Sequence, residues 1–304
     1  MLRFVLLAVT FGQVAFAGEG IPPFRVANEE LLALSRRLSE LDENGAHRQQ
    51  VKVNFQGHTT PGDTRDNAPE KLISGVDPFL FTRPTYKLLM VLFDNFHREA
   101  GRPEPRVSKQ EDAQESLAFL TAVLQSKVMQ EVYGFLNRKN HPFARNPNLF
   151  GTWMYQLWFG RYSRARGVLD SSAFEHVFVG EEKNGEVSGL HNWVRFFTLE
   201  NNATERFDYQ GFIVKRGGVM TTIRFNWKGL PKKSGSLMIG TSPEFDMALY
   251  TMCFLSRRGK EPCQVEVNGC PVSVTSYDLV QNGKAYIGTV YPTAGPQSDR
   301  CGRF

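Results

Sequence analysis

The first half of the chain has apolar residues at the spacing of amphipathic helices. This pattern predicts helices from Asn28 to about Asn44, from Tyr86 to His97, from Ser108 to about Lys139 and from Asn148 to Tyr162. Asn28 is suited to cap the first helix, and Ser108 with Glu111 has the spacing of a capping box. The apolar positions that define the first and third helices are Leu31, Leu34, Leu38 and Leu41, then Leu117, Leu120, Val123, Leu124, Val128, Val132 and Leu136.

After Arg166 the pattern changes to short runs that favour strands. The runs are Phe174–Val179, Phe212–Lys215, Met220–Phe225, Ser236–Ile239, Gln264–Val267, Pro271–Val274 and Lys284–Val290. Asn268-Gly269 is a strong hairpin signal, and Ser242-Pro243-Glu244 opens a short helix. We therefore predict one α+β domain, in which a helical lobe (about 23–165) packs on a lobe of antiparallel sheets with short helices (about 166–304).

The beginning of the chain has the pattern of a secretory signal peptide. Arg3 precedes the apolar run Phe4–Thr10, and Ala15-Phe16-Ala17 is a cleavage signal before Gly18. We expect residues 1–17 to be removed and the protein to be secreted. A buried N-terminal helix is the alternative. No later stretch reaches the roughly 18 apolar residues of a membrane span, so we expect no span.

The cysteines agree with an oxidising compartment. All four lie in the last sixth of the chain, and an even number suggests two disulfides with three conceivable pairings. We favour Cys253 with Cys263, because a turn lies between them, which leaves Cys270 with Cys301 to hold the C-terminus. Asn202 begins a glycosylation sequon, which predicts an exposed loop.

Composition adds little about function. The 304 residues carry a formal net charge of +5, or +4 without the leader, which favours polyanionic partners only slightly. Hydrophobic residues make up 41% of the chain, enough for a sizeable core. The Gly-x-Ser-x-Gly, His-Glu-x-x-His, Walker and Cys-x-x-Cys motifs are absent from the sequence, so the corresponding hydrolase, nucleotide-binding and zinc or redox classes lack support.

Two of the six histidines stand in distinctive surroundings. His176 lies in Phe-Glu-His-Val-Phe-Val-Gly-Glu and His191 in Ser-Gly-Leu-His-Asn-Trp. The segment between them, Glu182–Glu186, has the composition of a turn, so the chain can fold back and bring the two imidazoles together. Facing imidazoles suit proton transfer, because one can accept a proton while the other donates one.

RNA offers both proton transfers at a single phosphate. Its 2′-OH attacks and its 5′-oxygen leaves, and the transition state gains negative charge that needs a cation. Lys232 and Lys233, just before a predicted strand, are the candidates. Most chains of this length hold two histidines and a lysine, so this spacing alone names no enzyme.

Five blocks together resemble the EndoU family, the XendoU-like uridylate-specific endoribonucleases. They are the two histidine segments, Lys-Lys-Ser-Gly-Ser, Gly-Thr-Ser-Pro-Glu-Phe from Gly240 and Tyr-Ile-Gly-Thr-Val-Tyr from Tyr286. They cover about Glu175 to Tyr291, and the helical half from Pro23 to Tyr162 is similar to the N-terminal part of the family. The family cleaves single-stranded RNA at uridines and leaves 2′,3′-cyclic phosphate and 5′-hydroxyl ends.

The resemblance assigns roles to individual residues. His176 matches the first catalytic histidine and His191 the second. We assign His191 as the general base and His176 as the general acid, with the reverse assignment as the alternative. Lys232 matches the lysine of Lys-x-x-Gly-Ser, with Lys233 as the alternative. The uracil-side positions match Ser236, Thr289 and Tyr291, for which ordinary strand roles are the alternative.

The family also has acidic residues at the positions of Glu175 and Glu181, beside His176. They are expected to orient the histidine, to help hold a divalent ion or to form a structural ion pair. The family implies Mn²⁺, with Ca²⁺ as the alternative, although the proton chemistry itself requires neither.

The leading hypothesis is therefore a secreted, monomeric endoribonuclease that acts on uridine-containing single-stranded RNA. A secreted RNA- or polyanion-binding protein that does not cleave is the alternative.

Overall fold

The structure is a computed structural model of the chain, and it describes residues 20–102, 109–165, 167–259 and 261–301. The signal peptide predicted for residues 1–17 and Ser108, the expected cap of the third helix, lie outside the described residues. The helices are α1 Asn28–Leu41, α2 Pro84–Val91, α3 Lys109–Gln125, α4 Lys127–Arg138, α5 Pro147–Phe159, α6 Trp193–Glu200 and α7 Pro243–Arg257. The strands are β1 Val51–Val53, β2 Ile73–Val76, β3 Glu181–Lys183, β4 Glu186–Ser188, β5 Phe207–Arg216, β6 Met220–Trp227, β7 Leu230–Met238, β8 Cys263–Val267, β9 Cys270–Gln281 and β10 Lys284–Ala294.

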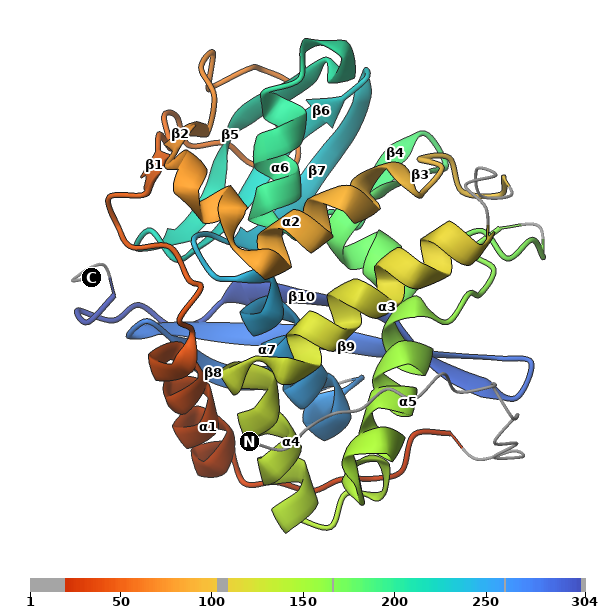
Figure 1. Cartoon of the computed structure of the whole chain (residues 1–304). Helices are drawn as coiled ribbons and strands as arrows, with labels where there is room; N and C mark the ends of the chain where they lie inside the picture. Colours follow the sequence, from red (N-terminus) through yellow and green to blue (C-terminus); the bar gives the residue numbers. More distant parts are fainter. Residues whose placement is uncertain (1–19, 103–108, 166, 260, 302–304) are drawn as a thin grey trace.

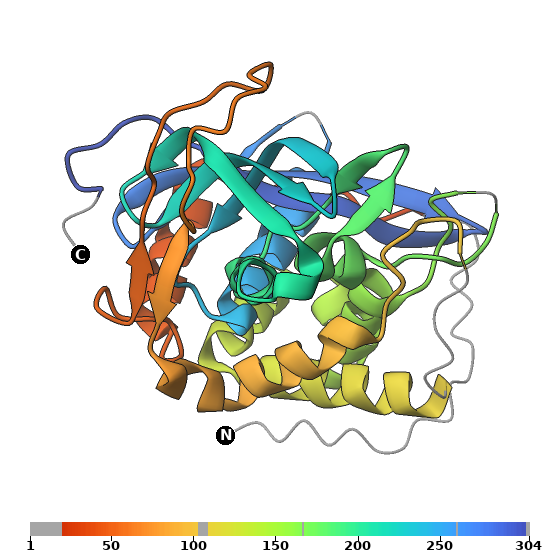
Figure 2. The ribbon, with the colours of Figure 1, turned by 90° about the horizontal axis from the view of Figure 1, so that it is seen from above.

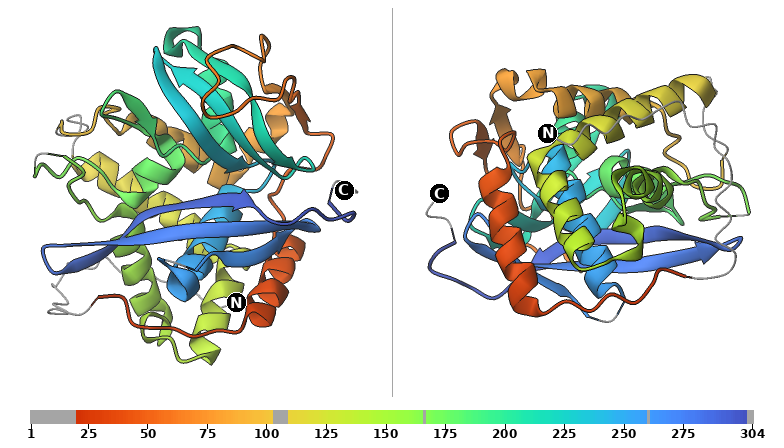
Figure 3. Two further views of the ribbon diagram at one scale, coloured as in Figure 1. Left: turned by 180° about the vertical axis from the view of Figure 1, so that it is seen from behind. Right: turned by 60° about the horizontal axis from the view of Figure 1, so that its bottom comes forward.

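Two three-stranded antiparallel sheets form the β part of the molecule. One has the order β5-β6-β7 and the other β10-β9-β8, and β1-β2 and β3-β4 are separate hairpins. From behind, the long β9–β10 hairpin crosses the molecule below the β5-β6-β7 sheet (Figure 3). Seen from above, α2 and α3 lie on the opposite side from that hairpin (Figure 2). The mixed helices and antiparallel sheets confirm the predicted α+β class.

Helix α7 lies at the centre of the fold, between the β8–β10 sheet and the helices α1 and α4 (Figure 1). The Ser242 side chain accepts from the Phe245 N–H and Pro243 occupies the first turn, so the predicted start is confirmed. The helix runs on to Arg257, because every residue from Pro243 to Ser256 is buried. The Trp158 indole N–H donates to Thr251 Oγ1 at 2.9 Å, which ties α5 to this central helix.

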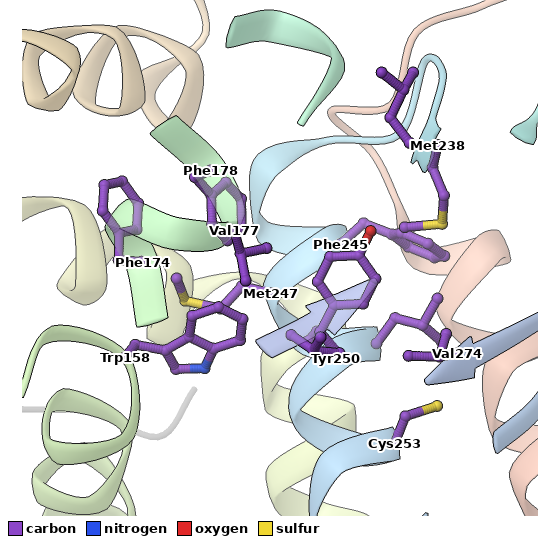
Figure 4. Packing of buried hydrophobic residues seen from close by; sticks show 14 of the residues in the cluster. Trp158, Phe174, Val177, Phe178, Met238, Phe245, Met247, Tyr250, Cys253 and Val274 are labelled. Carbon is purple, nitrogen blue, oxygen red and sulfur yellow. The ribbon is translucent and has the colours of Figure 1, made fainter. Parts of the chain in front are cut away.

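One hydrophobic core continues through both halves of the chain. Aromatic rings of α5 and of the 174–178 segment pack beside α7, and Met238 and Val274 bring in the two sheets (Figure 4). Trp193 is fully buried, and its indole N–H donates to the Thr241 carbonyl at 2.7 Å. No helix in the described part of the chain is long and apolar enough to cross a membrane.

Both favoured disulfides are present. Cys253 of α7 is bonded to Cys263 of β8, and Cys270 of β9 is bonded to Cys301. The Asn268-Gly269 turn joins β8 and β9 as predicted. Asn202 is exposed, as the sequon predicts.

Three predictions of local structure were wrong, and one helix was not predicted. Asn28 is the first residue of α1 and not its cap, because the extended residue before the helix is Ala27, whose N–H donates to the Glu30 side chain. The segment Phe174–Val179 is a buried helical turn and no strand, because the Ser172 hydroxyl accepts from the Glu175 N–H and starts a turn that Gly180 ends at a φ of 89°. The long helix to Lys139 is two helices, because extended Ser126 stops α3 and its hydroxyl caps α4. Helix α6, capped by the Asn192 side chain, was not foreseen.

Candidate active site

The segment that carries His191 folds back onto the turn that carries His176. The β3–β4 hairpin reverses the chain at Asn184-Gly185, where both residues have a positive φ. The Leu190 N–H then donates to the His176 carbonyl at 2.9 Å, and the His191 N–H donates to the Val177 carbonyl at 2.7 Å. These backbone bonds hold the two imidazole ring centres 6.3 Å apart, so the fold-back predicted from the sequence is confirmed.

Both rings open into one pocket of about 340 Å³ between the two sheets. Strands β6 and β7 form one wall and β10 forms the other. Hydroxyl and imidazole groups dominate the lining, and Lys232 is its cation. The lining residues are His176, Ser188, Gly189, His191, Thr222, Lys232, Ser234, Ser236, Thr289, Tyr291 and Thr293.

His176 is held at both ring nitrogens. Its Nδ1 lies 3.3 Å from Glu181 Oε2, and its Nε2 lies 3.0 Å from Thr289 Oγ1. Because a carboxylate only accepts, Nδ1 carries the proton in the neutral ring and Nε2 is the pocket-facing acceptor. Burial and then the charge of Arg164 lower the pKa of His176 to about 4, although Glu181 opposes them.

His191 has a different partner. Its Nδ1 donates to the Ser236 carbonyl at 2.7 Å, so Nε2 is the acceptor of the neutral ring. Burial, Lys232 and His176 together hold the pKa of His191 well below its usual range. The Tyr291 ring stacks on His191 with the ring centres 5.2 Å apart.

The structure distinguishes the two adjacent lysines. Lys232 lines the pocket, and burial lowers its pKa to about 8 against the pull of Glu186 and Glu181. Lys233 points away from the pocket, is 61% exposed and pairs with Glu186. A Cβ on Gly235 would lie 3.1 Å from Lys232 Cγ, so the glycine leaves room for the Lys232 stem.

The hydroxyl residues expected beside uracil all reach this pocket. Ser236 and Tyr291 line it, and the Thr289 hydroxyl is bonded to His176. Thr289 therefore contacts a histidine directly, a relationship that its position in a strand could not indicate.

The two acidic residues have different surroundings. Glu181 is buried, accepts from Ser171 and His176, and forms an ion pair with Arg164. Burial opposes ionisation, but these three partners hold the pKa of Glu181 below its usual range. Glu175 is fully buried and does not line the pocket.

The residues beside His176 do not fit a metal centre. The Glu181 carboxylate is occupied by two nitrogen donors and a hydroxyl, so it orients His176 instead of offering a free ligand. Among the described residues, no three His, Cys, Asp or Glu side chains converge to hold an ion.

Arg164 belongs to the site although no motif in the sequence pointed to it. Its guanidinium contacts Glu181 and the carbonyl of Gly288, the residue before Thr289. Its partners lie up to 124 residues away along the chain, so only the fold brings them together.

The chain matches the family model described as Endoribonuclease XendoU over residues 30–292. The Bos taurus uridylate-specific endoribonuclease is 38% identical over 88% of this chain and 65% of its own length. The Xenopus tropicalis poly(U)-specific endoribonuclease is 36% identical over 88% of this chain and 94% of its own.

A solved structure has the same architecture. It is described as XendoU, a splicing independent snoRNA processing endoribonuclease, and it superposes with a TM-score of 0.73 at 33% identity. The match covers 89% of this chain and 99% of that one. The chain spans about two thirds of the mammalian relatives, but almost all of the Xenopus protein and of the solved structure. The chain therefore belongs to the XendoU endoribonuclease family.

Proposed function

We propose that the protein is an endoribonuclease that cleaves single-stranded RNA at uridines through attack of the 2′-OH. One observation carries this proposal: two imidazoles and one buried lysine meet in a single pocket, and each imidazole has its own hydrogen-bond partner. The names of the relatives, which include uridylate-specific and poly(U)-specific endoribonucleases, support the choice of RNA and of uridine.

His191 is the general base in this proposal. The Ser236 carbonyl fixes its proton on Nδ1, which leaves Nε2 to accept the proton of the 2′-OH. Its lowered pKa keeps the ring neutral near pH 7.

His176 is the general acid. Glu181 accepts from Nδ1 and stabilises the imidazolium. The leaving oxygen can then replace Thr289 as the partner of Nε2 and take the proton that Nε2 carries. In the RNA-free protein its pKa is about 4, because burial and Arg164 disfavour the charge. A phosphodiester in the pocket supplies the negative charge that raises this pKa and loads the acid.

The reaction balances with these groups alone. The 2′-oxygen loses its proton to His191 and forms a bond to phosphorus, while the bond from phosphorus to the 5′-oxygen breaks. His176 protonates that 5′-oxygen, and Lys232 stabilises the negative charge on the non-bridging oxygens. The products are a 2′,3′-cyclic phosphate and a 5′-hydroxyl.

Uridine selection is assigned to Ser236 and Tyr291, with Thr289 beside them. A serine hydroxyl can donate and accept at the Watson–Crick edge of uracil, and a tyrosine ring can stack on base or ribose. The position of both side chains in the lining, next to His191, supports this role.

Secretion is also part of the proposal. The signal-like N-terminus and two disulfides support it, because disulfides persist in oxidising compartments. Expression in secretory cells, followed by N-terminal sequencing, would be expected to give a chain that begins at Gly18. A chain retained in the cytosol with Met1 intact would contradict it.

We keep Mn²⁺ as the proposed ion, with Ca²⁺ as the alternative, in a role on the RNA phosphates or on the conformation and not as a ligand of the residues beside His176. No step above passes through it. The family implies metal dependence only in general. We expect the cleavage products to have the same ends with EDTA and with Mn²⁺, whatever the two rates are.

The test uses a short RNA with one uridine and a matched RNA in which cytidine replaces it. Mass spectrometry should find a cyclic phosphate on the uridine and a 5′-hydroxyl on the next nucleotide, with far slower cleavage of the cytidine RNA. A linear 5′-phosphate product would overturn the mechanism. RNA retention on a filter without any cleavage would instead favour the non-catalytic binding protein.

A further inference from the structure

We propose that Arg164 is a positioning residue that fixes His176 from both sides, one arm of the guanidinium acting through Glu181 and the other through the backbone before Thr289. This proposal rests on the proposed function, because it concerns how the general acid is held. Nothing in the motifs around the two histidines includes this arginine.

Arg164 is placed by a short loop whose ends are joined. Tyr162 and Ser171 exchange backbone hydrogen bonds of 3.0 and 3.2 Å, and the Arg164 N–H donates to Asp170 Oδ1 at 2.8 Å. The Arg164 side chain is only 15% exposed and lies over the Tyr162 ring. The guanidinium is therefore held in one orientation.

The first arm of the guanidinium acts on His176 Nδ1 through Glu181. Arg164 Nε donates to Ser171 Oγ at 3.1 Å and lies 3.3 Å from Glu181 Oε2. The same Glu181 oxygen accepts from His176 Nδ1, and the Ser171 hydroxyl bonds the other Glu181 oxygen. Arg164 thus fixes the carboxylate that fixes the ring.

The second arm acts on Thr289, the partner of His176 Nε2, through the backbone of Gly288. Arg164 Nη2 donates to the Tyr162 hydroxyl at 2.7 Å and to the Gly288 carbonyl. The β9–β10 register shifts between Ile287 and Thr289, which leaves Gly288 in an irregular step of the ladder. Because Gly288 directly precedes Thr289, this bond sets the position of the hydroxyl that contacts His176 Nε2.

Arg164 also acts through its charge. Burial lowers the pKa of His176 the most, and the positive charge of Arg164 lowers it next, whereas Glu181 raises it. A lysine would supply the charge, but it lacks the planar fork that places Nε beside Glu181 and Ser171 and Nη2 beside the Gly288 carbonyl. The fork of the guanidinium is the feature that the geometry requires.

The experiment compares Arg164→Gln and Arg164→Lys with a matched control, Arg98→Gln. Arg98 pairs at 3.0 Å with Glu182, the residue after Glu181, and does not line the pocket. Single-turnover cleavage of the one-uridine RNA is measured for each variant. Nitrogen-15 NMR of the RNA-free proteins then follows the tautomer and titration of His176, with His176→Ala to assign its signals.

We expect Arg164→Gln to slow cleavage roughly 10- to 100-fold, as loss of an orienting partner typically does. The His176 pKa should rise, and its fixed Nδ1–H tautomer should become mixed. Arg164→Lys should restore the lower pKa but little of the rate. Arg98→Gln should match the wild type in both measurements.

Two results would overturn the proposal. One is an Arg164→Gln variant as fast as Arg98→Gln. The other is a slow Arg164→Gln variant whose His176 signals are unchanged, which would indicate a general structural role. If Arg164→Gln does not fold, Tyr162→Phe is the second variant. It removes one acceptor of the second arm and also the bonds of that hydroxyl to the Ile287 and Gly288 carbonyls, so it should slow cleavage a few-fold. An unchanged rate would count against the proposal. If the wild type cleaves no RNA, the proposed function fails, while the NMR comparison still decides whether Arg164 holds His176.

Discussion

Gly189 lies directly against the backbone of His176. A Cβ on Gly189 would lie 1.8 Å from the His176 carbonyl oxygen, and the φ of Gly189 is +69°. The two histidine segments can therefore pack together only because this position has no side chain. The separation of the two imidazoles depends on a residue that takes no part in the chemistry.

Gly189→Ala should reduce cleavage by about 100-fold or more, because a displacement of about 1 Å at reacting groups can cost this much. The matched control is Gly185→Ala in the same hairpin, where φ is +77° and no atom lies within 4 Å of an added Cβ. Both variants carry a left-handed alanine that costs about 1–2 kcal/mol, so only the contact with His176 differs. Equal cleavage rates in the two variants would contradict the account.

Lys232→Gln should lower the rate of the chemical step about 100- to 1,000-fold, since it removes the cation that faces the developing charge. Lys233→Gln should have little effect on that step, because Lys233 is exposed and paired with Glu186. Single-turnover rates at saturating protein separate chemistry from RNA binding. The assignment fails if Lys233→Gln is the slower variant.

The pH dependence of kcat/KM should show a further downward bend near pH 8, beyond the fall that follows loss of the His176 proton in the free protein. Burial lowers the pKa of Lys232 to about 8, and the lysine stabilises the transition state only when charged, so activity is lost as pH rises through this value. Lys232→Arg keeps its charge, so its profile should lack the bend even if its rates are lower. A bend that persists in Lys232→Arg must come from another group.

The two disulfides should differ in their contribution to stability. Loop-closure entropy gives about 3.7 kcal/mol for Cys270–Cys301 and about 2.7 kcal/mol for Cys253–Cys263, because 31 and 10 residues separate the partners. Urea unfolding of Cys270→Ser/Cys301→Ser and Cys253→Ser/Cys263→Ser double variants measures this difference. A larger loss from the shorter loop would show that strain or packing outweighs chain entropy.

The sequence predicted best where a local signal and the fold agree. Ser242 and Pro243 start α7 as their residue types require, and Asn268-Gly269 turns between β8 and β9. Phe174–Val179 was assigned to a strand because valine and phenylalanine favour strands. The Ser172 hydroxyl at the start of the turn decides otherwise, and burial of the whole segment hides any periodicity.

The site residues that lie within sequence motifs could be predicted, and those outside the motifs could not. The motifs around His176, His191 and Lys232 indicated the three proposed catalytic side chains. The choice between Lys232 and Lys233 required the structure, because only the structure shows that Lys232 lines the pocket and Lys233 is exposed. Helix α6 has an apolar face too short to show a period, although Asn192 before it was a usable cap signal. Arg164 was not predictable, because hydrogen bonds across the fold define its role.

The assignment of His176 as acid and His191 as base is the central claim, and one substrate tests it most directly. In a one-uridine RNA whose 5′-bridging oxygen at the cleavage site is sulfur, the leaving thiolate needs no proton. His176→Ala should therefore cleave this RNA nearly as fast as the wild type, although it barely cleaves the oxygen substrate. His191→Ala should remain slow on both. Rescue of His191→Ala instead of His176→Ala would reverse the two roles, and rescue of neither would contradict the proton-transfer mechanism.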